Sequence, residues 1–344
     1  MDNSTDAPDG TPMQHRWLLP TYLVVGIAGL LGNILVIIII SSVRKMQTVT
    51  NFFILHQSAI DMTSAVFLLT ILLSETALPG DYIMPSAACK LWFNKYPVWA
   101  CYMASTINLV GLTLERYHAI LRPLHHGTVF CQSRVLRFFP LCWLCGFFLI
   151  SYLIFIFDVT EGSICQISRI AIGLQASLGI STVIFYYFVP LCVMIFAYCS
   201  MLWEVRRQWK TTTGEHNHAD VASRDQRMRL RVEKNVLKVL ALVVAVYAVC
   251  WSPNQLAYLN YNFGGSLDFN GWFYHLSVVL ITCNMCINPF VYALKYQQFR
   301  EGMMLVFCRH RNAMVHARED STRESGVRNI TGTMAVQMEN GFSS

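Results

Sequence analysis

Apolar residues in this chain gather into seven long segments, which are separated by shorter polar stretches. A helix needs about 20 mostly apolar residues to cross the roughly 30 Å hydrocarbon core of a bilayer, and each segment reaches that length. Helices are favoured because they satisfy their own backbone hydrogen bonds where no water is available. The pattern predicts an all-α membrane protein, a seven-transmembrane helix bundle. The segments are Trp17–Ile40, Asn51–Leu73, Leu91–Leu114, Phe138–Phe157, Ile170–Trp203, Val236–Tyr258 and Trp272–Leu294.

Composition and charge agree with this class. The chain is 54% hydrophobic and only 13% charged, with a mean hydropathy of +0.42. If the N-terminus is extracellular, only Arg16, Lys90, Lys95 and Arg169 of the 26 Lys and Arg residues lie outside, which leaves 22 facing the cytoplasm. This asymmetry follows the positive-inside rule. The net charge of +6 therefore reflects orientation in the plasma membrane, and no nucleic-acid partner is expected.

A short amphipathic segment follows the last span. Phe299, Met303, Val306 and Phe307 share one face of a helix over Tyr296–Cys308, which predicts an eighth helix lying on the membrane surface. We therefore divide the chain into an extracellular N-terminus, a helical domain, a surface helix and a disordered cytoplasmic tail, at residues 1–16, 17–295, 296–308 and 309–344.

Some residues are candidates for covalent modification. Cys89 and Cys165 both face an oxidising compartment, so we expect a disulfide between them; two free thiols are the alternative. Asn3 opens an Asn-Ser-Thr glycosylation sequence. Cys308 is a candidate for palmitoylation, and an unmodified thiol is the alternative. Met1–Arg16 is short, polar and acidic, which does not match a cleavable signal peptide.

A few polar residues lie inside the spans. Asp61 is an acid in the second span, and an isolated carboxylate in hydrocarbon needs a partner. A sodium ion held by Asp61 and Ser105, near Asn284 and Asn288, would supply one, because hard cations prefer oxygen ligands. The alternative is a protonated or water-bridged Asp61 that only joins helices.

A second charged group lies where the third span ends. Arg116 is always charged, and the adjacent Glu115 can pair with it locally. Glu233 begins the sixth span at the same membrane depth, so an Arg116–Glu233 bridge would hold two helix ends together and let them separate when broken. The alternative is that Arg116 extends to the lipid headgroups.

Prolines interrupt three of the last spans. Each removes one backbone hydrogen bond and kinks its helix. Trp251 lies two residues before Pro253, and Asn288 directly precedes Pro289, so we interpret these four residues as activation pivots. The third proline is Pro190.

These motifs together resemble the rhodopsin-like (class A) G-protein-coupled receptors, with features of the neuropeptide-receptor-like subgroup, over about residues 17–308. Each span carries one signature residue of the family, in order. These are Asn33, Asp61, Arg116, Trp143, Pro190, Pro253 and Pro289, within the longer motifs Glu115-Arg116-Tyr117, Cys250-Trp251-Ser252-Pro253 and Asn288-Pro289-Phe290-Val291-Tyr292.

The resemblance implies a mechanism and partners. An extracellular ligand shifts an inactive–active equilibrium, the sixth span swings outward, and a heterotrimeric G protein docks at the cytoplasmic face. Arg116, Tyr198 and Tyr292 would stabilise the open state, and Leu124 would contact the G protein. Receptor kinases and arrestin would act on Ser and Thr residues of the tail, and membrane lipids surround the spans. No enzymatic activity is implied, and no cofactor apart from the allosteric sodium ion.

Two residues that other members of the family need for their ligands are absent from this sequence, which disfavours amine ligands and retinal. Amine receptors of the family need a carboxylate in the outer half of the third span, and no Asp or Glu lies between Cys89 and Leu114. Opsins need a lysine in the seventh span, where Thr282 stands at that place. Acids outnumber bases in the outer segments by eight to four, which would steer a cationic ligand. We therefore expect a peptide; a lipid or other small non-amine molecule is the alternative.

The ligand pocket has an uncertain register in the third span. Cys89 and Arg116 are 27 residues apart, about two more than is usual in the family. Counting back from Arg116 places Val98 at the pocket, whereas counting forward from Cys89 places Tyr96 there. The remaining pocket candidates are Trp99, Gln255, Tyr258 and Trp272.

Two other classes of membrane protein fit less well. Transporters usually contain repeated halves, and the chain has no internal repeat. An intramembrane enzyme needs a catalytic pair, but Asp61 is the only core carboxylate and His275 has no adjacent nucleophile.

Overall fold

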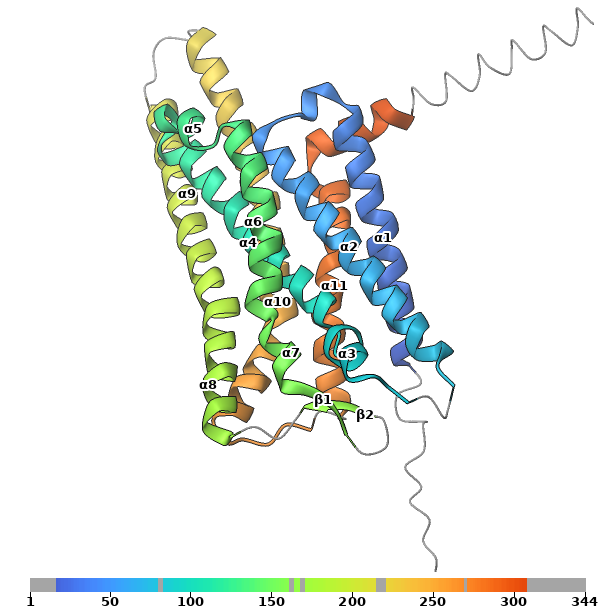
Figure 1. Ribbon diagram of the computed structural model, residues 1–344. Helices are drawn as coiled ribbons and strands as arrows, with labels where there is room; N and C mark the ends of the chain where they lie inside the picture. Colours follow the sequence, from blue (N-terminus) through green and yellow to red (C-terminus); the bar gives the residue numbers. More distant parts are fainter. Residues whose placement is uncertain are drawn as a thin grey trace, which may run out of the picture.

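The structure of the chain, a computed structural model, describes residues 17–79, 83–160, 164–167, 171–214, 221–268 and 271–307. Within them, seven helical spans are long and apolar enough to cross a membrane, and they form one bundle (Figure 1). The predicted multi-pass fold is therefore confirmed. The predictions for Asn3, Cys308 and the tail lie outside the described residues, as does Glu161, one of the acids of the outer segments.

The spans cross the bundle alternately up and down (Figure 1). The fourth span continues briefly into α7, and the fifth contains a one-turn π-helix, η3, between α8 and α9. The spans are α1 (Leu18–Ser42), α2 (Val49–Ala77), α4 (Tyr96–Leu121), α6 (Gln132–Ile150) with α7 (Tyr152–Ile156), α8 (Ile172–Val183) with η3 (Ile184–Phe188) and α9 (Val189–Gly214), α10 (Val221–Asn262) and α11 (Trp272–Lys295).

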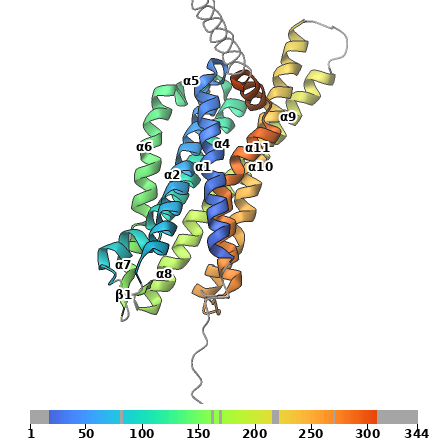
Figure 2. The same cartoon turned by 90° about the vertical axis from the view of Figure 1, so that its right-hand side faces the viewer.

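The connecting segments distinguish the two ends of the bundle (Figures 1 and 2). The end that we call the hairpin end carries the antiparallel strands β1 and β2 and the short helices α3 and η2. The opposite end, which we call the Arg116 end, carries α5, the long extensions of α9 and α10, and a helix over 297–307, as predicted for the eighth helix. The connecting elements are η1 (Arg44–Met46), α3 (Ser86–Ala88), η2 (Cys89–Phe93), α5 (Pro123–Val129), β1 (Phe157–Thr160) and β2 (Ile164–Ile167).

Helix α4 lies at the centre of the bundle. Over an 18-residue stretch, 78% of its span is buried, against 22% of the span formed by α6. It packs against α2, α6 and α9. A glycine lets α6 approach closely, because a Cβ at Gly146 would lie only 2.6 Å from the carbonyl oxygen of Ala100 on α4. The third span is therefore placed to connect the other helices.

The start of α4 explains the unusual length of the third span. The chain makes a π-helical turn in η2, and Lys95 then adopts a left-handed conformation with φ 61°. This break absorbs the additional residues before the helix begins at Tyr96. Pro97 lies in the first turn, where its missing amide costs no hydrogen bond. Pro97 therefore lies at the start of the helix and does not interrupt its backbone hydrogen bonds.

The kink at Pro289 is stabilised from another helix. Proline cannot donate to the carbonyl four residues earlier, which here is Met285 O. Asn33 on α1 donates its Nδ2 to this oxygen over 2.9 Å. The approach is possible because Gly32 lies against the proline ring, where a Cβ would be 3.1 Å from it. The signature residue of the first span therefore satisfies a backbone group of the seventh.

A similar exchange occurs at Pro190. The carbonyl that its missing amide leaves free belongs to Tyr186, within the π-helical turn. Tyr247 on α10 donates its hydroxyl to this oxygen over 3.1 Å. In a bilayer such a carbonyl has no water to accept from, so the partner on α10 replaces the lost backbone bond.

The close contact at Gly146 leads to a testable expectation. Gly146→Ala should destabilise the bundle by about 1–3 kcal/mol, because the added methyl group forces α4 and α6 apart. The measurement is the melting temperature of the purified protein. Gly173→Ala on α8 is the matched control, since a Cβ there meets nothing within 4 Å. Equal melting temperatures for the two variants would contradict the packing described for α4 and α6.

Candidate functional site

The centre of the bundle holds a buried carboxylate. Asp61 on α2 is 1% exposed and accepts hydrogen bonds from three side chains on three helices. Gln57 Nε2 lies 3.2 Å from Oδ1 and 3.3 Å from Oδ2. Ser105 Oγ on α4 donates to Oδ1 over 3.2 Å, and Asn288 Nδ2 on α11 donates to Oδ2 over 3.0 Å.

The sequence predicted part of this cluster. Asp61, Ser105 and Asn288 come together as expected from their depth in three different spans. Asn284 is half-buried one turn before Asn288, and the described donors to the carboxylate are other residues. Gln57 was missed, although its position one helical turn before Asp61 on the same face was a usable signal.

A second buried carboxylate lies at the Arg116 end. Glu115 is 0% exposed and binds Arg116 through both carboxylate oxygens, with Arg116 Nε 2.5 Å from Oε2. Thr50 Oγ1 on α2 donates to Oε2 over 3.3 Å. His126 Nε2 on α5 lies 2.9 Å from Oε1. The predicted local pair is therefore present, and Thr50 and His126 extend it to a neighbouring helix and a loop.

The other residues predicted for this end surround the pair. Tyr198 and Tyr292 are buried, and neither hydroxyl has a hydrogen-bond partner within the described part of the chain. Tyr117 packs its ring against Phe196 on α9. Glu233 is half-buried on α10 and has interactions of its own, so its bridge to Arg116 stays a prediction.

The predicted pivot Trp251 is embedded in aromatic rings. Its ring centroid lies 5.5 Å from that of Tyr247 on the same helix and 6.2 Å from that of Tyr102 on α4. Pro253 follows within α10. One residue beyond, Asn254 Nδ2 donates to Ser277 Oγ on α11 over 3.0 Å. The kinked part of α10 is thus in contact with both α4 and α11.

The structure decides the register of the third span. Because α4 is continuous, the count back from Arg116 holds, and Val98 is buried in the main core together with Tyr102 and Trp251. Tyr96 instead donates its hydroxyl to Phe147 O on α6 over 2.9 Å. Its side chain therefore faces the fourth span, and Tyr96 is a residue of the α4–α6 contact.

The remaining pocket candidates lie towards the hairpin end with different exposure. Trp99 packs edge-on against Tyr102, with centroids 5.7 Å apart. Gln255 is buried on α10, and its Oε1 has no hydrogen-bond partner among the described residues. Tyr258 is partly buried, whereas Trp272 is 66% exposed at the start of α11. Gln255 therefore stays a candidate for the ligand pocket, with a buried oxygen that no described residue satisfies.

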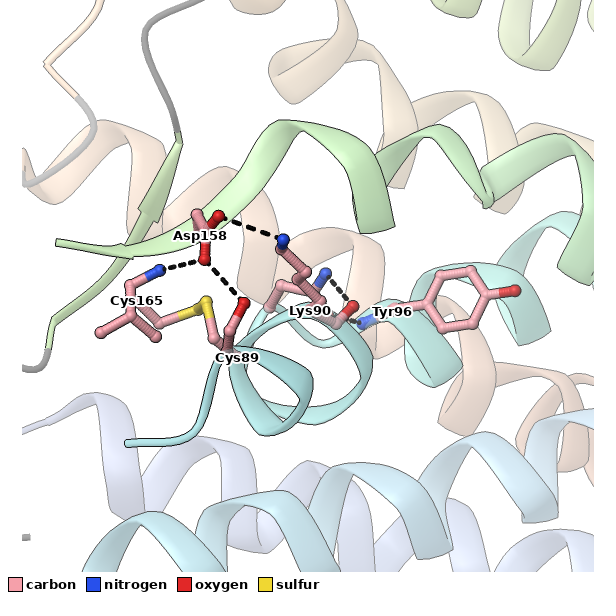
Figure 3. Close-up of a disulfide and its surroundings, with 8 residues drawn as sticks. Cys89, Lys90, Tyr96, Asp158 and Cys165 are labelled. Carbon is pink, nitrogen blue, oxygen red and sulfur yellow. Dashed lines mark hydrogen bonds and ion pairs between the residues drawn. A yellow bond between two sulfur atoms is a disulfide. The ribbon is translucent and has the colours of Figure 1, made fainter. Parts of the chain in front are cut away.

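The hairpin end is held by the expected disulfide. Cys89 in η2 is bonded to Cys165 in β2, which fixes the strand pair over the end of α4 (Figure 3). The predicted disulfide is therefore confirmed, and the alternative of two free thiols is excluded.

An ion pair reinforces the same contact. Asp158 on β1 accepts from Ser86 Oγ over 2.7 Å and from its neighbour's amide, Val159 N, over 2.9 Å, and it pairs with Lys90 Nζ over 3.1 Å (Figure 3). The Ser86 hydroxyl, followed by the Val159 amide and Lys90, lowers the pKa of Asp158 from 3.8 to about 2. The carboxylate is therefore charged at any physiological pH.

Comparison with known proteins agrees with this architecture. The family described as "7 transmembrane receptor (rhodopsin family)" matches residues 32–292, more than half of the chain. The chain therefore belongs to the rhodopsin family of seven-transmembrane receptors, and it is a G-protein-coupled receptor of class A rather than an enzyme.

Individual relatives are distant and diverse. The QRFP-like peptide receptor of Branchiostoma floridae is 25% identical over 318 residues, which cover 88% of this chain and 80% of the relative. Galanin receptor 2a of Danio rerio is 25% identical over 303 residues, covering 86% and 79%. Melanopsin-A of Danio rerio is 27% identical over 310 residues; the match covers 86% of this chain but spans only half the length of that relative.

The charge on Asp158 gives a prediction with a defined pH range. Because its pKa is lower in the folded chain than its ordinary value, its contribution is complete above about pH 4 and is lost as pH falls towards 2. Hydrogen exchange of the β1–β2 amides, corrected for intrinsic rates, should therefore not change between pH 8 and 5 on account of Asp158. Asp158→Asn should accelerate exchange there at neutral pH. Glu75→Gln, at a different ion pair of the same end, is the control, and equal exchange in both variants would contradict the assignment.

Proposed function

We propose that this receptor lies in the plasma membrane with its hairpin end outside, binds an extracellular peptide, and activates heterotrimeric G proteins by opening its Arg116 end. The observation that carries this proposal is the pair between Arg116 and the buried carboxylate of Glu115 at the end of the central helix. A permanently charged side chain held by a neighbouring carboxylate is a switch element, since it is released as soon as the carboxylate is bound elsewhere.

The contacts around the pair support two alternative arrangements. In the described one, Glu115 is held by Thr50 and His126 as well as by Arg116, so α2, α4 and α5 are tied together. The buried hydroxyls of Tyr198 and Tyr292 are available for new bonds if α10 moves outward. An unpaired buried hydroxyl is costly, so a rearrangement that brings these groups to Arg116 would be favoured.

Transmission from the ligand side would use the aromatic contacts of α10. Trp251 packs against both Tyr102 on α4 and Tyr247. Tyr247 in turn donates its hydroxyl to the backbone carbonyl of Tyr186 in the fifth span. A ligand that displaces Trp251 would therefore change the contacts of α10 with two other spans. Pro253, two residues after Trp251, is where the helix can pivot.

A peptide is the ligand class that the sequence and the relatives favour. The outer half of the third span carries no acid for an amine, and Thr282 stands where an opsin needs lysine. Two of the relatives are named for peptides. The excess of acids in the outer segments favours a basic peptide. A lipid or other small non-amine ligand is the second candidate.

The Arg116 end offers contacts for intracellular partners. Leu124 on α5 is 91% exposed, so its apolar side chain is accessible for a contact with the G protein. Receptor kinases and arrestin would bind the Ser and Thr residues of the tail.

Membrane lipids are a further expected partner. Between α4, α6 and α9 lies an apolar cavity of about 680 Å³, lined by side chains such as Val110, Leu114 and Phe138. Its size and apolar lining suit the acyl chain of a membrane lipid.

The role of Arg116 can be tested directly. In cells challenged with peptide, amine and lipid libraries, with calcium and cyclic AMP as readouts, Arg116→Ala should reduce ligand-stimulated signalling by roughly tenfold or more, the range of typical allosteric coupling. The amount of receptor at the cell surface should be preserved. Arg137→Ala is the control, because this exposed arginine on α6 bonds only its own helix in the described contacts. Full signalling by Arg116→Ala at normal surface expression would contradict the proposal.

Charge steering of the ligand makes a separate prediction. Neutralising Glu161 and Asp268 together, as Glu161→Gln and Asp268→Asn, should lower the potency of a basic peptide, and the loss should shrink at high ionic strength. The potency of a neutral ligand should not change. Unaltered potency of a basic peptide in the double variant would exclude steering by these two acids.

A further inference from the structure

The Asp61 cluster continues into a line of buried side chains that crosses four helices. Trp143 on α6 donates its Nε1 to His56 Nε2 over 3.0 Å. His56 Nδ1 lies 2.9 Å from Asn108 Oδ1 on α4. Asn108 Nδ2 then lies 2.9 Å from Gln57 Oε1 on α2. Gln57 leads to Asp61, so an unbroken path of hydrogen bonds joins α6 to α11.

Two groups at this line of hydrogen bonds have a fixed role, one as a donor and one as an acceptor. They determine which atom donates at each of the other bonds. The indole of Trp143 can only donate, so His56 Nε2 accepts and the proton of the neutral ring is on Nδ1. The backbone carbonyl of Phe53 can only accept, and Asn108 Nδ2 donates to it over 3.1 Å. Asn108 therefore turns its oxygen to His56 and its amino group to Gln57. The orientation of the Asn108 amide, and through it that of the Gln57 amide, follows from the hydrogen-bond network alone.

The direction of the line determines what faces the carboxylate. Since Gln57 Oε1 accepts from Asn108, its amino group must point at Asp61, where it reaches both carboxylate oxygens and Ser105 Oγ. Ser105 and Asn288 also donate. Every described contact of the carboxylate is thus an N–H or O–H donor, and charge-assisted bonds of this kind are roughly twice as strong as neutral ones.

This donor set does not fit a sodium ion. A hard cation needs several oxygen lone pairs directed at it, but Gln57 and Asn288 both present amino hydrogens to the carboxylate oxygen Oδ2. Gln57 is itself only 2% exposed and is held at its other end by Asn108. Turning its amide over would place Asn108 and Gln57 amino groups against each other.

We propose that the Gln57 amide takes the place of the allosteric cation, so that this receptor is insensitive to sodium. The geometry supports this assignment because residues 57 and 61 stand one turn apart on the same face of α2. The amide is therefore tethered beside the carboxylate and satisfies it permanently. Asp61 then links α2, α4 and α11 at any sodium concentration.

The test is the melting temperature of the purified, ligand-free receptor in sodium chloride and in choline chloride at equal ionic strength. A cation that binds only the folded state raises the melting temperature in a saturable way. The wild-type value should be the same in both salts. Gln57→Leu should acquire a saturable sodium-dependent rise of about 2–4 °C, and adding Asp61→Asn should abolish it. Because no ligand is used, the result does not depend on the proposed peptide or G protein.

Two results would overturn the proposal. One is a sodium-dependent rise in the wild type that Asp61→Asn removes. The other is a folded Gln57→Leu variant that remains insensitive to sodium. If the leucine variant does not fold, Gln57→Met, which is closer in length to glutamine, is measured in the same way. Gln47→Leu, at an exposed glutamine outside the spans, is the control for loss of an amide and should behave as wild type.

Discussion

The carboxylate of Asp61 is the constraint on which the arrangement of the bundle depends. A charge buried in the middle of a membrane protein is tolerated only if donors surround it. Here the donors come from α2, α4 and α11, so these helices must meet at one depth and in one rotation. Glu115 repeats the principle at the Arg116 end with groups from α2, α4 and α5. The two buried acids together set the positions of the helices that a receptor has to move.

The backbone imposes a related constraint. Prolines give the later spans their kinks, and each leaves a carbonyl without its normal donor in a medium that supplies no water. Asn33 and Tyr247 provide the donors from neighbouring helices. Polar side chains inside the spans therefore have two kinds of task. Some balance a charge, and others replace a backbone hydrogen bond, and both tie one helix to another.

The sequence predicted the architecture well because long apolar segments, and polar residues inside those segments, are strong signals in a membrane protein. Seven spans, the surface helix over 297–307, the Cys89–Cys165 disulfide and the meeting of Asp61, Ser105 and Asn288 were all accessible. Each depends on how far a residue lies along its span or on which face of the helix it lies. Because a helix has a fixed rise and a fixed number of residues per turn, both can be counted from the sequence.

What the sequence did not predict depends on contacts between elements. His126 reaches Glu115 only because α5 packs against α4, and nothing local in the loop signals this. The choice between Tyr96 and Val98 required knowing where the additional residues of the third span are absorbed, which is before the helix at Lys95. Gln57 has a local signal, its spacing from Asp61. The direction of its amide, however, is decided by Trp143 and Phe53, one of them on another helix.

The hydrogen bond from Asn33 to Met285 O also restricts how this protein can evolve. If Pro289 alone were replaced by a residue with an amide, the helix would regain its own bond, and Met285 O would accept from that amide as well as from Asn33, because a carbonyl oxygen has two lone pairs. If Asn33 alone were lost, the carbonyl would remain unpaired in hydrocarbon. Loss of Asn33 is therefore acceptable mainly where Pro289 has also been replaced. The two positions, 256 residues apart in the chain, are therefore linked in evolution, and the order of substitution matters: the proline can be replaced first, the asparagine only afterwards.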